Sequence, residues 1–235
     1  MNTDPISGTA LVTGGSKGIG KAISEKLIAE GCKVIIADII PPEGALKEAI
    51  YMECDVSDGV QVDRMFSRIM KQHGLPDFLI LNAGRGIREK LTEGDPEKWQ
   101  QIIHTNVMGP LRCIRSFVPP MTDRGKGSVV FISSVAANQP HPYGGIYAAS
   151  KSALEVIAET LRQETLPHLK ITIISPGIVD TDFFKDEVSG NLNIDQLGMG
   201  AINAAEIAED VWYALNKNTG TAINKIITRP INQNF

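Results

Sequence analysis

Short apolar segments of strand length alternate along the chain with longer amphipathic segments. We expect strands near residues 9–13, 33–38, 50–55, 77–82, 127–133, 170–175 and 221–228, with helices or loops between them. Residues 21–30 are predicted to form a helix that ends at Gly31, and residues 97–118 form another helix-like stretch. This alternation predicts parallel crossovers, with helices on both faces of one sheet. The predicted fold class is therefore α/β, with a doubly wound parallel sheet.

The chain shows no sign of a boundary between domains. Pro41-Pro42-Glu43-Gly44 is too short for an interdomain linker and is typical of a surface connection. The 235 residues are 43% apolar and 21% charged, which is enough to bury a substantial core without a second domain. We therefore expect a single domain over residues 1–235.

A glycine-rich turn follows the first predicted strand, with Gly14, Gly18 and Gly20 leading into the helix. Glycines allow a tight turn, and the N–H groups at a helix N-terminus attract a pyrophosphate. The next strand ends in Asp38, 18 residues after Gly20, where an acidic residue accepts hydrogen bonds from an adenosine ribose. The alternatives are an ordinary strand-turn-helix connection and, for Asp38, a turn-forming end to the strand. The order of these residues favours dinucleotide binding.

Tyr147 and Lys151 are four residues apart, so a helix places a phenol and an ammonium group on one face. An isolated tyrosine keeps its proton up to about pH 10, and a neighbouring cation favours the phenolate. The pair therefore predicts proton exchange with an alcohol or a ketone. The same spacing also arises by chance on solvated helix faces.

Together these motifs resemble the short-chain dehydrogenase/reductase family in its classical form, over essentially all of the first 181 residues. The glycine spacing matches, Asn82-Ala83-Gly84 follows a predicted strand, and Ser134 lies thirteen residues before Tyr147. The resemblance implies a Rossmann-type fold and NAD(P)-dependent hydride transfer between a nicotinamide and a small alcohol or carbonyl substrate. A nicotinamide-binding redox sensor or regulator with little catalysis is the alternative.

The resemblance implies four catalytic residues. Tyr147 is the expected general acid in ketone reduction and the base in alcohol oxidation, while Lys151 favours its ionised form and reaches the nicotinamide ribose. Ser134 is expected to donate a hydrogen bond to the carbonyl oxygen, although it could instead satisfy local backbone groups. Asn106 precedes Pro110 by four residues, so its carbonyl lacks the usual helical N–H partner. We expect a water there that links Lys151 to solvent, with a plain proline kink as the alternative.

The cofactor preference depends on two residues that disagree. Asp38 would face the 2′-phosphate of NADP(H) as a like charge, whereas Lys17 would partly neutralise that phosphate. We expect NAD(H) to be favoured, with NADP(H) as the alternative. The resemblance implies the following cofactor-binding residues: Gly14, Ser16, Lys17, Gly18, Ile19, Gly20, Asp38, Asp55, Val56, Asn82, Ala83, Gly84, Tyr147, Lys151, Pro176, Gly177, Ile178 and Thr181.

The substrate side is less well defined. Residues 182–202 are a candidate substrate lid, and residues 221–230 lack the family's usual Asp-Gly-Gly ending, which leaves the substrate class open. Leu81 replaces a frequent asparagine without removing a proposed catalytic group. Five side chains are candidate entrance residues. His141 and Tyr143 could line the entrance or simply shape a loop, and Arg85 could meet an anionic substrate or lie in solvent. Phe183 and Phe184 could form an apolar lid with residues 189–200, or pack in the core.

Charge and composition restrict the partners. A net charge of −4 and a pI near 5.6 give no reason to expect nucleic-acid binding. With neither a signal sequence nor a membrane-spanning run, we expect a cytoplasmic protein. Cys32, Cys54 and Cys113 are widely spaced and are interpreted as reduced packing thiols, and we expect no metal site. The helices around residues 99–114 and 153–161 carry many apolar positions, which could simply pack on the sheet. The resembling family pairs these two helices across a two-fold axis, so the resemblance implies a homodimer or homotetramer.

Overall fold

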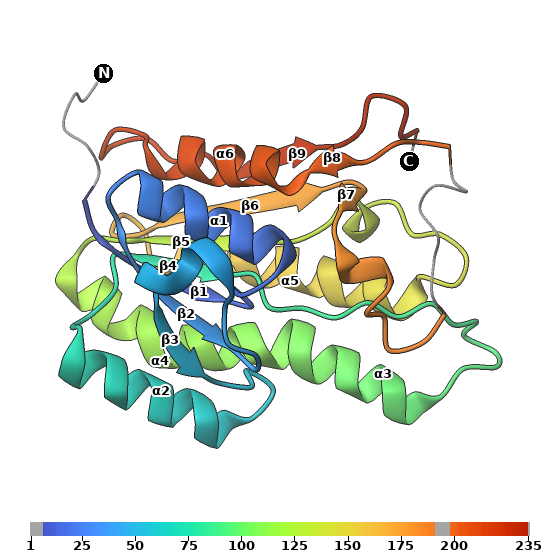
Figure 1. Cartoon of the computed structure of the whole chain (residues 1–235), viewed down its shortest axis with the longest axis horizontal. Coiled ribbons are helices and arrows are strands. Elements are labelled where there is room, and N and C mark those ends of the chain that lie inside the picture. The colour runs from blue at the N-terminus through green and yellow to red at the C-terminus, as the bar shows by residue number, and fades with distance from the viewer. Residues whose placement is uncertain (1–6, 191–197, 235) are drawn as a thin grey trace.

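The computed structural model describes residues 7–190 and 198–234, which form a layered α/β fold (Figure 1). Its main sheet has seven parallel strands in the order β3-β2-β1-β4-β5-β6-β9. Their interiors are continuous apolar runs because helices cover both faces of the sheet. The predicted fold class is confirmed. The strands are β1 (Thr9–Thr13), β2 (Lys33–Asp38), β3 (Ile50–Glu53), β4 (Phe78–Leu81), β5 (Ser128–Ile132), β6 (Lys170–Pro176) and β9 (Lys225–Thr228).

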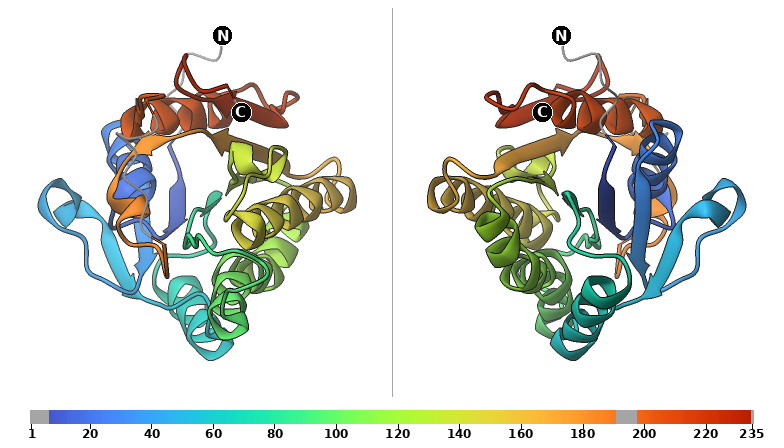
Figure 2. Two further views of the ribbon diagram at one scale, coloured as in Figure 1. Left: turned by 90° about the vertical axis from the view of Figure 1, so that its right-hand side faces the viewer. Right: turned by 90° about the vertical axis from the view of Figure 1, so that its left-hand side faces the viewer.

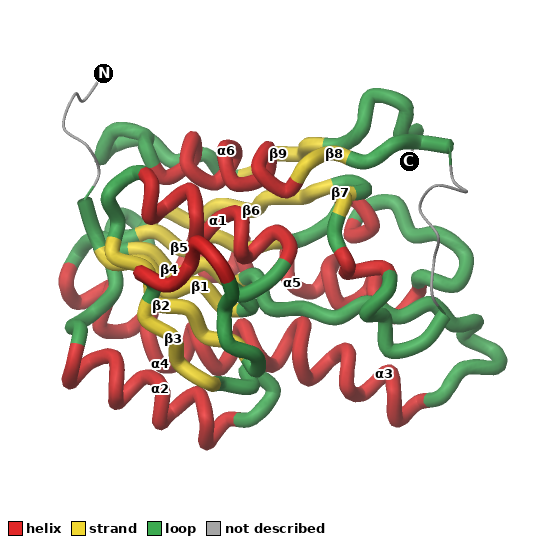
Figure 3. The backbone as a smooth tube through the Cα atoms, in the orientation of Figure 1, coloured by secondary structure: helices red, strands yellow, loops and turns green. Residues whose placement is uncertain are grey.

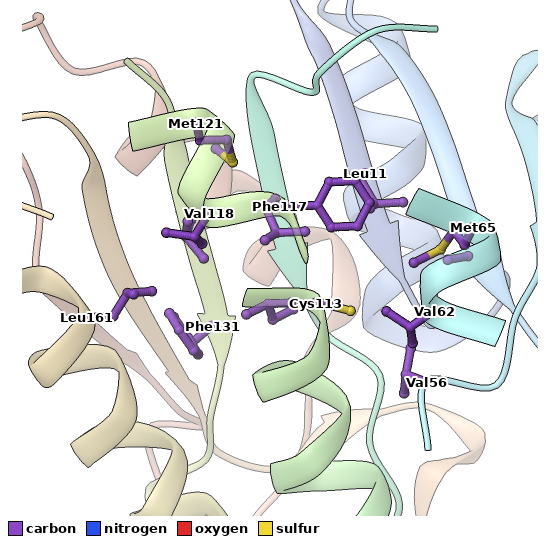
Figure 4. Close-up of a cluster of buried hydrophobic side chains, with 14 of the residues drawn as sticks. Leu11, Val56, Val62, Met65, Cys113, Phe117, Val118, Met121, Phe131 and Leu161 are labelled. Carbon is purple, nitrogen blue, oxygen red and sulfur yellow. The ribbon is translucent and has the colours of Figure 1, made fainter. Parts of the chain in front are cut away.

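Two groups of helices enclose the sheet (Figure 2). On one face lie α1 (Gly18–Ala29) and α6 (Ala204–Leu215), with a 3-10 turn at Gly44–Glu48, and together they bury one apolar cluster. On the other face, α2 (Gly59–Gln72), α4 (Gly109–Arg124) and α5 (Gly145–Glu164) bury a second cluster. Figure 4 shows this second cluster, where Phe117 of α4 reaches toward Leu11 of β1. The helix faces therefore pack on the sheet as their apolar spacing predicts.

The strand boundaries differ from the prediction mainly near the C-terminus. The last strand begins at Lys225 instead of residue 221, because the preceding residues follow a turn in which the Thr221 N–H bonds to the Asn218 carbonyl. The sequence analysis also missed a second sheet of two short strands, β7 (Val179–Asp180) and β8 (Ile202–Asn203). Two-residue strands are too short to produce an alternating pattern.

The helix expected over residues 97–118 is interrupted. It divides into α3 (Pro96–Ile103), a π-helical turn at His104–Met108 and α4. In this turn the Gly109 N–H bonds to the His104 carbonyl, five residues back instead of the usual four. The helix thus changes to a π-turn just before Pro110, where the sequence alternative was a plain proline kink.

The order of the strands locates a crevice. From β1, the strands β2 and β3 extend the sheet toward one edge, and β4, β5, β6 and β9 then extend it toward the opposite edge. In open sheets of this type, ligands bind beyond the carboxyl ends of the strands where the direction reverses, here between β1 and β4. Beyond the end of β6 lie β7, β8 and the loops around them (Figure 3). Among the described residues, no helix is both long and apolar enough to span a membrane.

Candidate active site

The glycine-rich turn after β1 is packed so tightly that side chains do not fit. Gly14 has a φ of +63°, and a Cβ atom there would lie 2.9 Å from the Cα of Ala83. A Cβ atom at Gly20 would lie 2.0 Å from the Gly14 carbonyl oxygen and 2.4 Å from the Asn82 amide nitrogen. Asn82 holds the turn, since its Nδ2 donates to the carbonyls of Thr13 (3.0 Å) and Gly14 (2.9 Å). The turn brings the N-terminus of α1 to the crevice, where Gly18, Ile19 and Gly20 line the cavity.

Asp38 ends β2 and has a structural role as well as a place at the cavity. Its carboxylate accepts hydrogen bonds from the backbone N–H groups of Ser16 (2.9 Å) and Ile40 (3.3 Å). The Ser16 hydroxyl donates to the Ile40 carbonyl (2.8 Å), and Ser16 is buried behind the cavity wall. Ser16 therefore positions the turn, whereas Asp38 and Lys17 line the cavity itself.

One continuous cavity of about 1010 Å³ runs along the carboxyl ends of the strands. Every predicted cofactor-binding residue except Ser16 lines it, from the glycine turn and Asp38 to Tyr147 and Lys151. A dinucleotide requires a large site, a helix N-terminus for its pyrophosphate, and glycines that let it approach the backbone. This cavity offers all three, with a volume near the upper end of the range for ligand sites. The residues present thus fit such a cofactor.

Tyr147 and Lys151 lie on the first turns of α5 and face the cavity. The Lys151 Nζ donates to the Ile132 carbonyl at the end of β5 (2.8 Å) and lies 5.8 Å from the centre of the Tyr147 ring. Ser134 follows β5, lines the same part of the cavity, and its hydroxyl also accepts the Ala136 N–H (3.2 Å). Ser134 thus makes the local backbone contact that was its alternative role and also forms a hydrogen bond with Tyr147.

The electrostatics of this pair differ from the expectation based on charge proximity. Burial raises the pKa of Tyr147 to about 12, a hydrogen bond with Ser134 acts in the opposite direction, and the charge of Glu187 raises the pKa further. Burial also lowers the pKa of Lys151 to about 8. Lys151 is therefore mostly protonated at neutral pH, but in the protein alone it does not bring the tyrosine near neutrality.

Asn106 lies behind the cavity wall and is almost completely buried. Its Oδ1 accepts the Arg85 N–H (2.8 Å), and its Nδ2 donates to the Arg85 carbonyl (2.9 Å) and the Ser150 hydroxyl (3.0 Å). A Cβ atom at Gly84 would lie 3.3 Å from the Asn106 Oδ1 and 3.5 Å from the Lys151 Nζ. The asparagine side chain thus joins the loop after β4 to α5, next to the lysine. A water at its main-chain carbonyl stays a prediction.

The segment after β6 carries the predicted residues Pro176, Gly177, Ile178 and Thr181 along the cavity. Gln233 holds this segment, because its Oε1 accepts the Ile178 N–H (3.0 Å) and would lie 2.1 Å from a Cβ atom at Gly177. The sequence analysis missed Gln233, since no motif surrounds it near the C-terminus.

The five candidate entrance residues all line the cavity. Phe183 packs beside Tyr147, with ring centres 5.8 Å apart, and Phe184 packs edge-on against Phe183 at 5.5 Å. Tyr143 adopts a positive φ of +69°, a backbone conformation that is rare for a residue other than glycine. Of the predicted lid over 182–202, residues 191–197 lie outside the described residues.

Glu89 lies outside the cavity and ties the substrate-side loops together. Its carboxylate accepts hydrogen bonds from the indole N–H of Trp99 (2.8 Å), the backbone N–H of Asp95 (3.0 Å) and the hydroxyl of Ser189. The Glu89 N–H donates to the Tyr143 carbonyl (2.9 Å). The sequence analysis missed this residue because its partners are far away in the chain, up to 100 residues for Ser189.

The cysteines lie in the interior. Cys54 and Cys113 belong to the second apolar cluster, in which Figure 4 labels Cys113, and burial raises the pKa of each thiol to about 12. Burial also raises the pKa of the Cys32 thiol. Within residues 7–190 and 198–234, no group of histidine, cysteine and carboxylate side chains is arranged to hold a metal ion.

Comparison with known proteins identifies the class. The family model for short chain dehydrogenases matches residues 8–191, and the chain belongs to this family of oxidoreductases. Dehydrogenase/reductase SDR family member 11 of Mus musculus is 31% identical over 245 residues, covering 95% of this chain and 94% of its own.

Two solved structures share the fold along nearly the whole chain. The closed form of serine dehydrogenase, complexed with NADP+, has a TM-score of 0.86 at 25% identity, with 97% of this chain and 96% of that chain covered. The ligand-free aldohexose dehydrogenase of Thermoplasma acidophilum has a TM-score of 0.86 at 26% identity, with coverages of 97% and 94%.

Proposed function

We propose that the protein transfers hydride between a nicotinamide cofactor and a small alcohol or carbonyl substrate, with Tyr147 as the acid and base. One observation carries the proposal: Tyr147, Lys151 and Ser134 line the same cavity as the glycine cradle. The similarity to serine and aldohexose dehydrogenases supports a small alcohol or carbonyl substrate, and the NADP+ in the first supports a nicotinamide cofactor.

Each side chain has a distinct task in this proposal. With its raised pKa, Tyr147 keeps a proton at neutral pH that it can donate to a ketone oxygen. Ser134 donates a hydrogen bond to the same oxygen, which becomes more negative as hydride arrives at carbon. Lys151 is a nearby cation that favours the phenolate and can reach a ribose hydroxyl. When bound, the nicotinamide supplies or accepts the hydride, and its oxidised form adds a positive charge that also favours the phenolate.

A Tyr147→Phe variant tests the acid-base role. The phenylalanine ring keeps the packing against Phe183 but has no exchangeable proton, so we expect turnover to fall by about 10²–10⁴-fold while cofactor binding stays intact. Turnover is followed by nicotinamide absorbance on a panel of alcohols and carbonyls. Tyr213→Phe, on the exposed face of α6, is the matched control and should leave turnover unchanged. Near-normal turnover in Tyr147→Phe would contradict the assignment.

The alternative is a redox sensor or regulator that binds the cofactor and catalyses little. It predicts nicotinamide binding without turnover of any panel member in either direction. The presence of Asn106, Ser134, Tyr147 and Lys151 around one end of the cavity favours an enzyme, because a sensor has no use for a proton donor there.

We also propose a preference for NAD(H). The Asp38 carboxylate at the end of β2 would repel a 2′-phosphate. The opposing cation Lys17 lies close enough to Asp182 to help lower the pKa of that carboxyl group, which the hydrogen bond from Lys185 lowers most. Measuring kcat/KM for both cofactors in the parent and in Asp38→Asn tests this preference. The asparagine keeps an oxygen acceptor for Ser16 or Ile40 but removes the charge, so the preference should shrink. A parent that prefers NADP(H) would contradict the proposal.

The proposal includes a cytoplasmic homodimer or homotetramer. Leu154, Ala158 and Leu161 of α5 are buried against the sheet, which is the alternative explanation for their spacing. Val156, in contrast, is 67% exposed, and Met108 is 37% exposed. Val156 lies on α5 and Met108 on the π-helical turn just before α4, and these two side chains support an assembly through that region. Light scattering at micromolar concentration tests it. A monomer would contradict it.

A further inference from the structure

One polar group in the cavity has no task in the proposed reaction. Glu187 lies on the segment after β7, where the neighbouring Val188 N–H bonds to the Gly86 carbonyl (2.9 Å). Its side chain lies against the loop after β4, since a Cβ atom at Gly86 would lie 3.0 Å from the Glu187 Cγ and 3.1 Å from its Oε1. The same Cβ atom would lie 3.0 Å from the Cε1 of Phe183, so Glu187 and Phe183 both lie against Gly86. The side chain is thus held at the substrate end of the cavity.

The second oxygen of this carboxyl group is unsatisfied. The Glu187 Oε2 is buried and has no hydrogen-bond partner among the described residues. A buried carboxylate oxygen without a donor costs free energy, and nearly all buried polar atoms in native proteins have a hydrogen-bond partner, so this oxygen calls for a donor from outside the chain. Burial accordingly raises the pKa of Glu187 to about 7, and only the charge of Arg88 acts against this.

Glu187 is also close to the reacting end of the cavity. Its charge raises the pKa of Tyr147, and both residues line the cavity together with Phe183. When the reacting oxygen of a substrate lies at Tyr147, the substrate atoms next to it therefore lie between the Phe183 ring and the unsatisfied Oε2 of Glu187. A purely apolar substrate would leave that oxygen without a donor, and a substrate carboxylate would meet it as a like charge.

We propose, resting on the hydride-transfer function above, that Glu187 is a specificity-determining residue that accepts a hydrogen bond from a second donor on the substrate. The substrate class is then a small alcohol that bears another hydroxyl group or an ammonium group next to the reacting carbon, or the corresponding carbonyl compound. Tyr147 and Glu187 hold the two polar groups, and Phe183 contacts the carbon atoms between them.

Three alcohols of equal heavy-atom number test the inference: propane-1,2-diol, 1-aminopropan-2-ol and butan-2-ol. At pH 8, above the pKa of Glu187, kcat/KM should be about 10–100-fold higher for the better of the two donor-bearing alcohols than for butan-2-ol. Comparison of the diol with the amino alcohol distinguishes a hydroxyl donor from an ammonium donor. Glu187→Leu should bring the ratio close to one.

Two further variants separate recognition from folding. Glu187→Gln keeps the shape and one acceptor oxygen, so it should lose selectivity for the ammonium compound more than for the diol. Glu164→Gln removes the same charge from an exposed site at the end of α5 and should keep the parental ratios. Thermal unfolding of each variant shows whether it is folded.

The outcomes distinguish the inference from the function on which it rests. Equal kcat/KM for the three alcohols, or ratios that a folded Glu187→Leu variant retains, would overturn the role of Glu187 alone. Turnover of other alcohols or carbonyls but of none of these three would also overturn the inferred substrate class. No nicotinamide-dependent turnover of any alcohol or carbonyl compound would overturn the proposed function itself.

Discussion

Replacing Glu155 with glutamine should destabilise the protein by about 2–4 kcal/mol, because its carboxylate joins α5 to the ends of several strands. Oε1 accepts hydrogen bonds from the hydroxyls of Ser133 (3.1 Å) and Ser175 (2.9 Å) and from the Lys225 ammonium (2.9 Å). Oε2 accepts from the Asn138 amide (3.0 Å) and again from Lys225 (2.8 Å). All five contacts require an acceptor.

The magnitude follows from the acceptors that glutamine lacks. Its amide oxygen can keep Ser133 and Ser175, but its NH₂ group then faces the donors of Asn138 and Lys225. The bond from the uncharged Asn138 amide, at an exposed position, is worth about 0.5–1.5 kcal/mol, and the bond from the Lys225 ammonium is worth about 1.5–3 kcal/mol; both are lost. Solvent screens the ion pair only partly, since the Glu155 side chain is 15% exposed and that of Lys225 is 30% exposed.

The effect should depend on pH. Burial raises the pKa of Glu155, but the hydrogen bonds from Lys225, Asn138 and Ser175 outweigh it and hold the pKa below its ordinary value of 4.5. A carboxyl group with a lowered native pKa stabilises the folded state above its unfolded pKa and loses that contribution as pH falls through the native pKa. The difference between parent and variant should therefore be full at pH 7 and shrink below pH 4.5.

Thermal unfolding followed by circular dichroism measures the difference. For a chain of this size, a loss of about 2–4 kcal/mol lowers Tm by roughly 4–16 °C. Glu159→Gln is the control, because Glu159 lies one turn further along α5, is exposed, and pairs with Arg162 and Gln163 of its own helix; it should change Tm much less. Equal and small changes in the two variants would refute the reasoning.

Three further predictions follow from other parts of the structure. Gly20→Ala should abolish the rise in Tm that NADH or NADPH causes in the parent, because the Cβ atom would overlap the Gly14 carbonyl oxygen; an undiminished rise would contradict the cradle. The pKa of Glu187 is raised from 4.5 to about 7, so its contribution to stability is present below pH 4.5 and lost as pH rises through 7. Relative to Glu187→Gln, the free energy of unfolding of the parent in urea should fall by about 1–2 kcal/mol between pH 5 and pH 8. One pKa unit is worth about 1.4 kcal/mol, and solvent partly screens the group. A difference between the two proteins that does not change with pH would argue against the raised pKa. Finally, Cys54 and Cys113 should react with a disulfide reagent only after unfolding in urea, because burial keeps their thiols protonated, and rapid native-state reaction would disprove this burial.

The sequence predicted those parts of the fold that local patterns determine. The ranges of β1 and β2 agree with the prediction, because each is a short apolar run that ends at a turn residue. Glycine spacing likewise predicted the tight turn, where Gly14 and Gly20 leave no room for a side chain. Local patterns therefore suffice where backbone conformation and burial are decided within a few residues.

Contacts between distant segments were not predictable in the same way. Glu89 reaches Ser189 across 100 residues, and Gln233 reaches Ile178 across 55. The unsatisfied oxygen of Glu187 is evident only once the loop after β4 packs against it. The pKa of Tyr147 also differed from the expectation, because spacing reveals a neighbouring charge but not the degree of burial.

The π-helical turn at His104–Met108 joins α3 to α4, and it sets how far one helix is rotated about its axis relative to the other. Each residue of an α-helix advances it by about 100°, so deleting one residue from the turn would make the rod regular and rotate one half against the other. Phe117 is fixed in the core, so α3 would rotate, carrying Trp99 away from Glu89. The side chain of Asn106, inside the turn, would leave the backbone of Arg85. The one extra residue of the π-turn therefore lets α4 stay packed in the core while α3 and Asn106 keep their contacts with the loops around the substrate.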